Sequence, residues 1–286
     1  MPKASSAVLP AIFVGLWSTG FVFARLGLPY ASPFTFLGVR MAIACALMIF
    51  VALTLGASWP RDLREGGHIA LAGLLFHATY LAGVFEAIAH GVSTGIVALI
   101  AGLQPILTAA VAGPLLGERV STRQWLGLIL GFAGIALVVW DRVGAHEGTP
   151  AGFALAFVCL IGITAGTLYQ KRFCPDMDPR SGTAIQFGVA AAALTVLSLL
   201  FETGRIVWSP HFVAALSWLT LVLSVGTFNL LVLLIRRGAA SRVSSLFYLV
   251  PPVTAVIGWA AFGEVLSPVT LAGMGVAVVG VALVNG

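Results

Sequence analysis

Two segments of the chain carry the same pattern. The first is GERVSTRQWLGLILGFAGIALV, residues 117–138, and the second is GEVLSPVTLAGMGVAVVGVALV, residues 263–284. At this offset of 146 residues the Gly-Glu pair, the following serine and several glycines coincide. Because polar positions coincide along with apolar ones, we interpret the match as an internal repeat. One copy occupies residues 1–144 and the other residues 145–286.

The composition is that of a membrane protein. Hydrophobic residues make up 59% of the 286 residues and charged residues only 9%, against roughly 25% charged in soluble domains. At about 20 residues per crossing, ten crossings use about 200 residues and leave only short loops. This excludes a soluble enzyme, a nucleic-acid binder and a receptor with an ectodomain. The basic excess indicates membrane topology.

Ten apolar stretches bounded by charged residues, glycine or proline predict ten transmembrane helices in an all-α integral membrane protein. Each repeat holds five helices. Because five is odd, the second copy enters the membrane from the opposite face. We therefore expect two inverted five-helix repeats, an architecture typical of alternating access. The predicted spans are 7–27, 32–55, 67–90, 92–116, 121–140, 150–171, 180–201, 212–236, 239–262 and 267–285.

Lysine and arginine segregate to one side of these spans. Eleven lie on the side of the N-terminus and three on the other. The positive-inside bias then places both termini in the cytoplasm of a cell inner (plasma) membrane protein. The eleven are Lys3, Arg61, Arg64, Arg119, Arg123, Lys171, Arg172, Arg180, Arg236, Arg237 and Arg242, and the three are Arg25, Arg142 and Arg205.

Four motifs of the first half occur in a specific order. They are WSTGF (17–21) followed by Arg25, FLGVR (36–40), Pro105 and LGER (116–119). In order, spacing and duplication they resemble the drug/metabolite transporter (DMT) superfamily, in particular its ten-helix EamA-type exporters. The resemblance covers nearly the whole chain. It implies two five-helix EamA units, with the first four helices of each around a central substrate cavity, and efflux of amino acids or related metabolites.

Arg40 and Glu86 are charged residues that lie well inside predicted spans, away from the span ends. Arg40 lies roughly 12 Å and Glu86 roughly 7 Å from the outer ends of their helices, so both occupy the outer half. The repeat has Gln186 and Val232 at the equivalent positions. Since both charges disappear together, we predict an intramembrane ion pair. The alternatives are that Glu86 extends to the outer surface near His90, or that it carries protons.

Polar and aromatic side chains inside the spans are candidates for a substrate pathway. His77 and Tyr80 share a helix face, whereas Glu86 points to the opposite face, which excludes a metal site from these residues. The alternative for each is a packed core residue or an interhelical hydrogen bond. The candidate pathway residues are Trp17, His77, Tyr80, Gln104, Tyr169, Asn229 and Tyr248.

Prolines and small residues shape the predicted helices. Pro105, Pro251 and Pro252 predict kinks, because a proline within a span frees a backbone carbonyl. Helices 5 and 10 carry stripes of small residues that permit close backbone approach. We expect these stripes to pack within one chain, in a monomer; dimerisation through helices 5 and 10 is the alternative. The stripes are Gly127, Gly131 and Gly134, and Gly273, Ala277 and Gly280.

The function class expected from these features is secondary transport of a small organic metabolite by alternating access. The resemblance favours an amino acid or a related compound as the exported substrate. A polyspecific drug exporter and a nucleotide-sugar-type exchanger remain alternatives, and an intramembrane enzyme or a channel is more remote. The chain lacks a Walker A motif, and we expect no cofactor, no metal and no nucleic-acid partner. Proton coupling and facilitated exchange both stay open.

Overall fold

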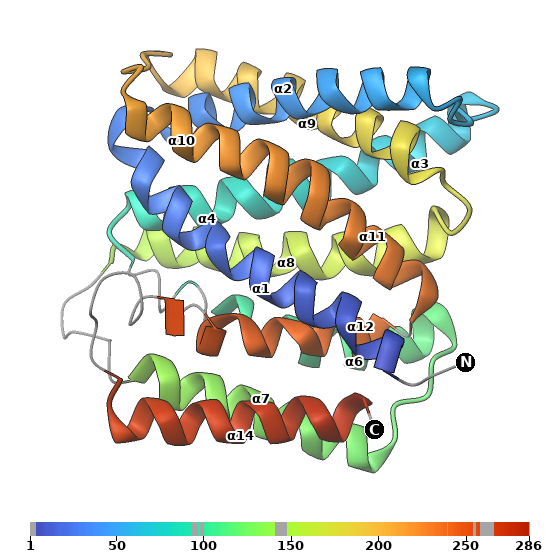
Figure 1. Ribbon diagram of the computed structural model, residues 1–286, viewed down its shortest axis with the longest axis vertical. Helices are drawn as coiled ribbons and strands as arrows, with labels where there is room; N and C mark the ends of the chain where they lie inside the picture. Colours follow the sequence, from blue (N-terminus) through green and yellow to red (C-terminus); the bar gives the residue numbers. More distant parts are fainter. Residues whose placement is uncertain are drawn as a thin grey trace.

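A computed structural model describes residues 4–92, 97, 100–140, 148–238, 240–253, 256–257 and 266–285. Apart from short connections and an isolated antiparallel bridge between Ala31 and Ile206, these residues are helical (Figure 1). The elements in chain order are α1 (Ala4–Gly27), η1 (Leu28–Tyr30), α2 (Pro33–Thr54), α3 (Leu63–Gly73), η2 (Leu74–Thr79), α4 (Tyr80–Ala89), α6 (Gln104–Leu116), α7 (Thr122–Trp140), α8 (Pro150–Phe173), α9 (Pro179–Phe201), α10 (Pro210–Trp218), η3 (Leu219–Thr227), α11 (Phe228–Arg237), α12 (Ala240–Ser245), η4 (Leu246–Leu249) and α14 (Pro268–Asn285).

Within the described ranges, seven helices are long and apolar enough to cross a membrane. Two shorter apolar helices are Gln104–Leu116 and Thr122–Leu137. The chain is therefore a multi-pass membrane protein. The predicted spans 92–116 and 239–262 run through positions outside the described residues, so the count of ten stays a prediction. The seven long helices are Val8–Tyr30, Pro33–Thr54, Leu63–Ala89, Pro150–Phe173, Pro179–Phe201, Pro210–Arg237 and Pro268–Asn285.

Two of the long helices contain a π-helical stretch in their middle. One is η2, which joins α3 to α4, and the other is η3, which joins α10 to α11. Shifted by the repeat offset of 146 residues, η2 falls on 220–225, inside η3. A π-helical turn holds an extra residue and redirects the side chains around it, which is frequent at functional sites. His77 lies in η2 and Ser224 in η3.

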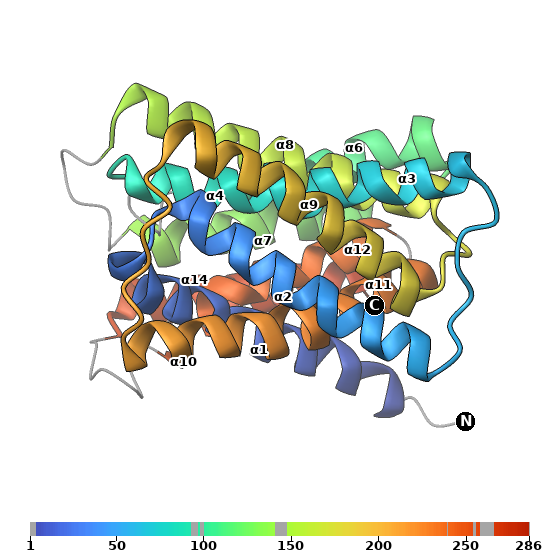
Figure 2. The same cartoon turned by 90° about the horizontal axis from the view of Figure 1, so that it is seen from above.

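Helices α2 and α9, which are equivalent under the same offset, pack side by side and run antiparallel (Figures 1 and 2). At one end, the Glu202 carboxylate that follows α9 accepts hydrogen bonds from the backbone N–H groups of Phe34 (2.8 Å) and Thr35 (2.7 Å). At the other end, Asp178 accepts one from the backbone N–H of Ser58, at 3.2 Å. Carboxylates stabilise helix N-termini, where N–H groups lack partners. The pair is thus joined at both ends.

Helices α7 and α14 form a second antiparallel pair, at one edge of the bundle (Figure 1). A β-carbon on Gly127 would lie 2.6 Å from the Gly280 carbonyl oxygen, and one on Gly134 would lie 2.7 Å from that of Gly273. Only glycine permits such close backbone approach. The predicted small-residue stripes therefore face each other within the chain. The oligomeric state stays a prediction.

The prolines predicted to kink helices lie at interruptions. Pro105 lies in the first turn of α6, directly after a turn at 102–103, where a missing N–H group costs little. Pro251 and Pro252 follow the 3-10 turn η4. In both places the α-helix is interrupted just before the proline, and the proline does not bend a continuous helix.

Candidate substrate cavity

A cavity of about 1080 Å³ lies among α1, α2, η2, α4 and η3. It begins at the end of the bundle where α2 and α10 start and α4 ends, at the left of Figure 1. Tyr30, Gly91 and Arg205 line this mouth, and Arg205 is exposed. Arg40 and His77 line the interior of the cavity, both of them almost completely buried. Its volume suits a small organic molecule.

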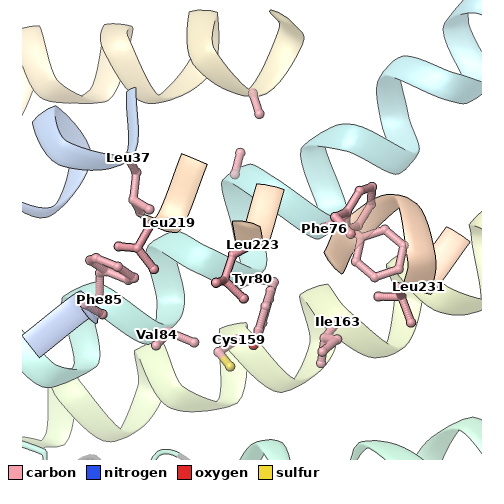
Figure 3. Close-up of a cluster of buried hydrophobic side chains, with 14 of the residues drawn as sticks. Leu37, Phe76, Tyr80, Val84, Phe85, Cys159, Ile163, Leu219, Leu223 and Leu231 are labelled. Atoms are coloured by element: carbon pink, nitrogen blue, oxygen red, sulfur yellow. The ribbon is translucent and has the colours of Figure 1, made fainter. Parts of the chain in front are cut away.

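Three predicted pathway residues line the cavity, namely Trp17, His77 and Tyr80. The Trp17 side chain interacts with that of Tyr80. Figure 3 shows Tyr80 between Leu223 of η3 and Cys159 of α8. Side chains from three neighbouring elements, α1, η3 and α8, therefore hold Tyr80 in place. Tyr80 also lines the cavity.

His77 is held by aromatic rings. Its imidazole lies edge-to-face with Phe187, at a ring-centroid distance of 4.7 Å, and with Phe228, at 4.2 Å. Its Nε2 is buried and has no hydrogen-bond partner among the described residues. A buried nitrogen without a partner is costly. This ring is therefore rigidly placed and retains unused hydrogen-bonding capacity.

Arg40 and Glu86 do not form the predicted ion pair. The Arg40 Nε donates a hydrogen bond to Ser224 Oγ at 3.0 Å, because the buried face of α2 packs on η3. The Glu86 carboxylate lies 3.6 Å from His90 Nδ1, one turn further along and near the mouth. The pair is absent from this conformation and stays a prediction. The alternative that placed Glu86 near His90 fits the geometry.

The other four predicted pathway residues lie outside the cavity lining. Gln104 Nε2 donates to Ser244 Oγ at 2.9 Å, and the Tyr169 hydroxyl lies 2.6 Å from His68 Nδ1. Asn229 Nδ2 donates to the carbonyl oxygen of Val225, one turn earlier, at 2.7 Å. These side chains join or stabilise helices, as interhelical polar groups often do.

Tyr248 is fully buried, and its hydroxyl has no hydrogen-bond partner within the described part of the chain. A β-carbon on Gly131 would lie only 2.2 Å from its ring, so α7 supplies a glycine where the tyrosine packs. Tyr248 thus joins η4 to the pair formed by α7 and α14. It does not reach the cavity in this structure.

Ser224 is a cavity residue that the sequence analysis missed. It is a buried serine in an apolar run, and it binds Arg40 from a position 184 residues away. Its signal was its polarity within a span, and its repeat equivalent, Ala78, adjoins His77. Phe76 and Phe228 also line the cavity and were missed, because aromatic residues are common in apolar helices.

The opposite end of the bundle is closed by contacts between elements. Lys171 at the end of α8 forms an ion pair with Glu118, at 3.1 Å, and donates a hydrogen bond to the carbonyl of Gly238. Arg236 of α11 donates to the carbonyl of Met177 at 3.1 Å. The cavity lining includes none of these five residues. Among the described residues, the cavity lining therefore reaches one end of the bundle and not these contacts at the other.

The charged side chains of the described cavity lining are all positive. Arg40 and Arg205 are its charged residues, and the described lining contains no aspartate or glutamate. The described part of the chain also holds no group of three or more His, Cys, Asp or Glu residues that could bind a metal ion. The walls can therefore attract an anion and contact apolar groups with aromatic rings.

A bundle of apolar helices around one cavity, open at one end and closed at the other, is an arrangement typical of small-molecule transporters. The chain belongs to the EamA-like transporter family, whose model matches residues 5–140 and again residues 150–286. The resemblance noted in the sequence to this branch of the DMT superfamily is confirmed.

Individual relatives support the transporter assignment. The chain is 28% identical to the "Uncharacterized transporter YvbV" of Bacillus subtilis, over all of this chain and 93% of that protein. It is also 28% identical to a "Probable terminal-alkyne amino-acid exporter" of Streptantibioticus cattleyicolor, over 99% of this chain and 94% of the relative. A crystal structure that is 22% identical matches with a TM-score of 0.83, covering 99% of this chain and 96% of that one, so it shares the fold.

Proposed function

We propose that this transporter exports a small organic metabolite by alternating access. The observation that carries the proposal is the cavity of about 1080 Å³, open at one end and bounded at the other by the contacts of Lys171. A cavity open at both ends would favour a channel. Alternating access requires a second conformation with the opposite end open.

The inverted repeat explains how two such conformations can exist. We infer it from the two antiparallel pairs, α2 with α9 and α7 with α14, each of which joins helices that are 146 residues apart in the sequence. The π-helical stretches η2 and η3 recur under the same offset. Two halves of similar structure and opposite orientation can exchange roles, which opens either end in turn.

The topology that goes with this proposal has both termini in the cytoplasm of an inner-membrane protein. The excess of basic residues at the closed end supports it, so the described cavity faces outward. A cysteine introduced at 61–65 should be labelled by an impermeant reagent only from the cytoplasm, and one at 205–211 only from outside. Labelling of both from one side would contradict the inverted repeat.

The substrate class that we propose is amino acids or related metabolites. Its support is the printed name of the Streptantibioticus relative, an amino-acid exporter. Counterflow in proteoliposomes, with a panel of radiolabelled amino acids, purines and cationic drugs, tests this proposal. Exchange of an amino acid or a related acid is the expected result, whereas exchange of cationic drugs alone would favour a polyspecific drug exporter.

Coupling to protons through Glu86 is a separate step of this proposal. Glu86 lies near the mouth beside His90, where a carboxyl group can exchange protons with water. Glu86→Gln should abolish transport driven by a proton gradient and preserve counterflow, which needs no gradient. Equal loss of both activities would assign Glu86 a structural role, and gradient-driven transport at the normal rate would show that the proton passes elsewhere.

A further inference from the structure

Arg40 carries a buried charge without an acidic partner. Its side chain is 6% exposed, and within the described residues no carboxylate lies within 4 Å of it. Its Nε binds Ser224, whereas its two terminal nitrogens have no hydrogen bond to any described residue. Buried charges in proteins are normally paired, because desolvation of a lone charge is costly. Since Arg40 lines the cavity, the missing partner can come from the cavity.

The groups around Arg40 suit a ligand that is anionic at one end and apolar elsewhere. Arg40 interacts electrostatically with His77 and Tyr80, so the three lie close together. The His77 Nε2 adds a second buried polar atom that lacks a partner. Trp17 and Phe228 complete the lining with aromatic surface. An apolar or aromatic substrate body packs well on such rings.

The cavity offers no comparable site for an ammonium group. Its described lining has no acidic side chain. The nearby carboxylate of Glu202 is occupied by the backbone of Phe34 and Thr35, and that of Glu86 lies beside His90. An amine could contact only ring faces, which bind cations more weakly than a carboxylate does. The asymmetry therefore favours recognition of the acidic end of the substrate.

We propose that Arg40 is the binding site for a substrate carboxylate, and that the cavity selects monocarboxylates with an apolar body whether or not they carry an amino group. This inference rests on the proposed transport function. The planar guanidinium presents its terminal N–H groups in the fork that matches a carboxylate, and Ser224 orients it through Nε. The substrate class thus includes aromatic and branched carboxylic acids as well as amino acids.

Binding to the purified full-length protein tests the proposal with three ligands that share one body. Radiolabelled 3-phenylpropanoate has only the carboxylate, phenylalanine has both groups, and phenethylamine has only the ammonium. We expect 3-phenylpropanoate to bind and unlabelled phenylalanine to displace it, while phenethylamine does not. Failure of 3-phenylpropanoate to bind, or its displacement by phenethylamine as effectively as by phenylalanine, would overturn the proposal.

Variants assign the effect to Arg40. Arg40→Gln should weaken binding of 3-phenylpropanoate at least about tenfold, and it should fold because the second half carries Gln186 at the equivalent position. Arg172→Gln, exposed and outside the cavity lining, is the matched control and should change affinity less than about twofold. Arg40→Lys preserves the charge but loses the planar fork, so it should bind several-fold more weakly. Unchanged affinity in both Arg40 variants would contradict the assignment.

Counterflow separates this inference from the proposed function. If carboxylates bind through Arg40 but nothing crosses the membrane, the site stands and the transport proposal fails. If another compound is exchanged while carboxylates neither bind nor move, transport stands and the carboxylate site is wrong.

Discussion

Asp178 lies at the closed end of the bundle, where it links the segment that follows α2 to the start of α9. Its Oδ1 accepts the backbone N–H of Arg180 at 2.9 Å, its Oδ2 pairs with the Arg180 guanidinium at 2.7 Å, and Arg180 in turn donates to the carbonyl of Leu55 at 2.9 Å. These hydrogen bonds from Arg180 lower the pKa of the Asp178 carboxyl to about 2. One ionised side chain thus orders the start of α9 and the end of α2 together.

The charge on Asp178 should make stability depend on pH. Its pKa in the folded protein, about 2, is lower than the unfolded value of about 3.9. Its contribution is therefore complete above about pH 4 and is lost as the pH falls toward 2. Asp178→Asn should lower the stability at pH 7 by up to about 1 kcal/mol, because the pair is partly solvated. Thermal unfolding in detergent from pH 7 to pH 3 should show the difference shrinking.

Asp176→Asn, in the same connection and exposed, is the control for this measurement. It should not change the melting temperature at any of these pH values. A constant difference between Asp178→Asn and the parent protein over the whole range would show that the ionised carboxylate is not the stabilising form.

Individual site residues could be predicted only in part. Trp17, Arg40, His77 and Tyr80 line the cavity, whereas Gln104 and Asn229 bind neighbouring helices. Every polar residue in an apolar span gives the same signal in the sequence. Which face meets the cavity depends on packing between helices that are far apart in the chain, as the bond between Arg40 and Ser224 illustrates.

At the scale of elements, the helices follow from apolar length, but their irregularities do not. The predicted span 212–236 corresponds to Pro210–Arg237, and 180–201 to Pro179–Phe201. The π-helical stretches were not predicted, because an extra residue in a turn leaves no trace in a helix that is apolar on all sides. They depend on compensating hydrogen bonds, such as the one that Thr227 donates to the Val222 carbonyl at 2.8 Å.

Thr227→Val should destabilise the protein by about 1–3 kcal/mol, because it removes the hydroxyl of a fully buried residue that donates to the Val222 carbonyl of η3. Thr54→Val is the matched control. Thr54 makes the same kind of bond to the Phe50 carbonyl at 2.8 Å, but it is exposed at the end of α2, where water can replace it. Thermal unfolding of both variants measures the difference. Equal effects would show that the π stretch needs no support from Thr227.

The contact between α4 and α8 gives a second prediction for the elements. A β-carbon on Gly83 would lie 2.6 Å from the backbone nitrogen of Cys159 and 2.8 Å from the Leu155 carbonyl oxygen. Gly83→Ala should therefore separate the two helices and destabilise the protein by about 1–3 kcal/mol. Gly15→Ala, with no atom within 4 Å of the new carbon, should be neutral or slightly stabilising. Similar melting temperatures for the two variants would contradict this packing.

At the scale of the whole molecule, the proposed alternating access makes the balance between conformations depend on contacts at the closed end. The pair between Lys171 and Glu118 is partly exposed, with side-chain exposures of 24% and 15%. Such a pair contributes about 0.2–1 kcal/mol to stability. A difference of that size changes the equilibrium constant between two conformations by up to about fivefold. A modest change at this end should therefore change how often the opposite end is open.

Under the proposed topology and mechanism, Lys171→Gln should weaken the closed end and reduce the outward-open population. A cysteine in place of Gly20, which lines the cavity and has room for a side chain, reports this population. Its labelling by an impermeant reagent from outside should slow by up to about fivefold in Lys171→Gln. Arg172→Gln, at the neighbouring exposed position, should leave the rate unchanged. Faster labelling in Lys171→Gln would show that this pair does not hold the closed end.

The pairing of α7 with α14 has a consequence for biogenesis. The ribosome completes α7 long before it reaches α14, so the glycine-rich surface of α7 first faces lipid or the insertion machinery. Its close partner, from Gly273 to Gly280 in α14, emerges only after the other described helices. Premature termination within α14 would therefore leave a membrane-inserted but incompletely assembled chain, recognisable to quality-control proteases. This pair can therefore form only late in assembly, after the first helices have been inserted.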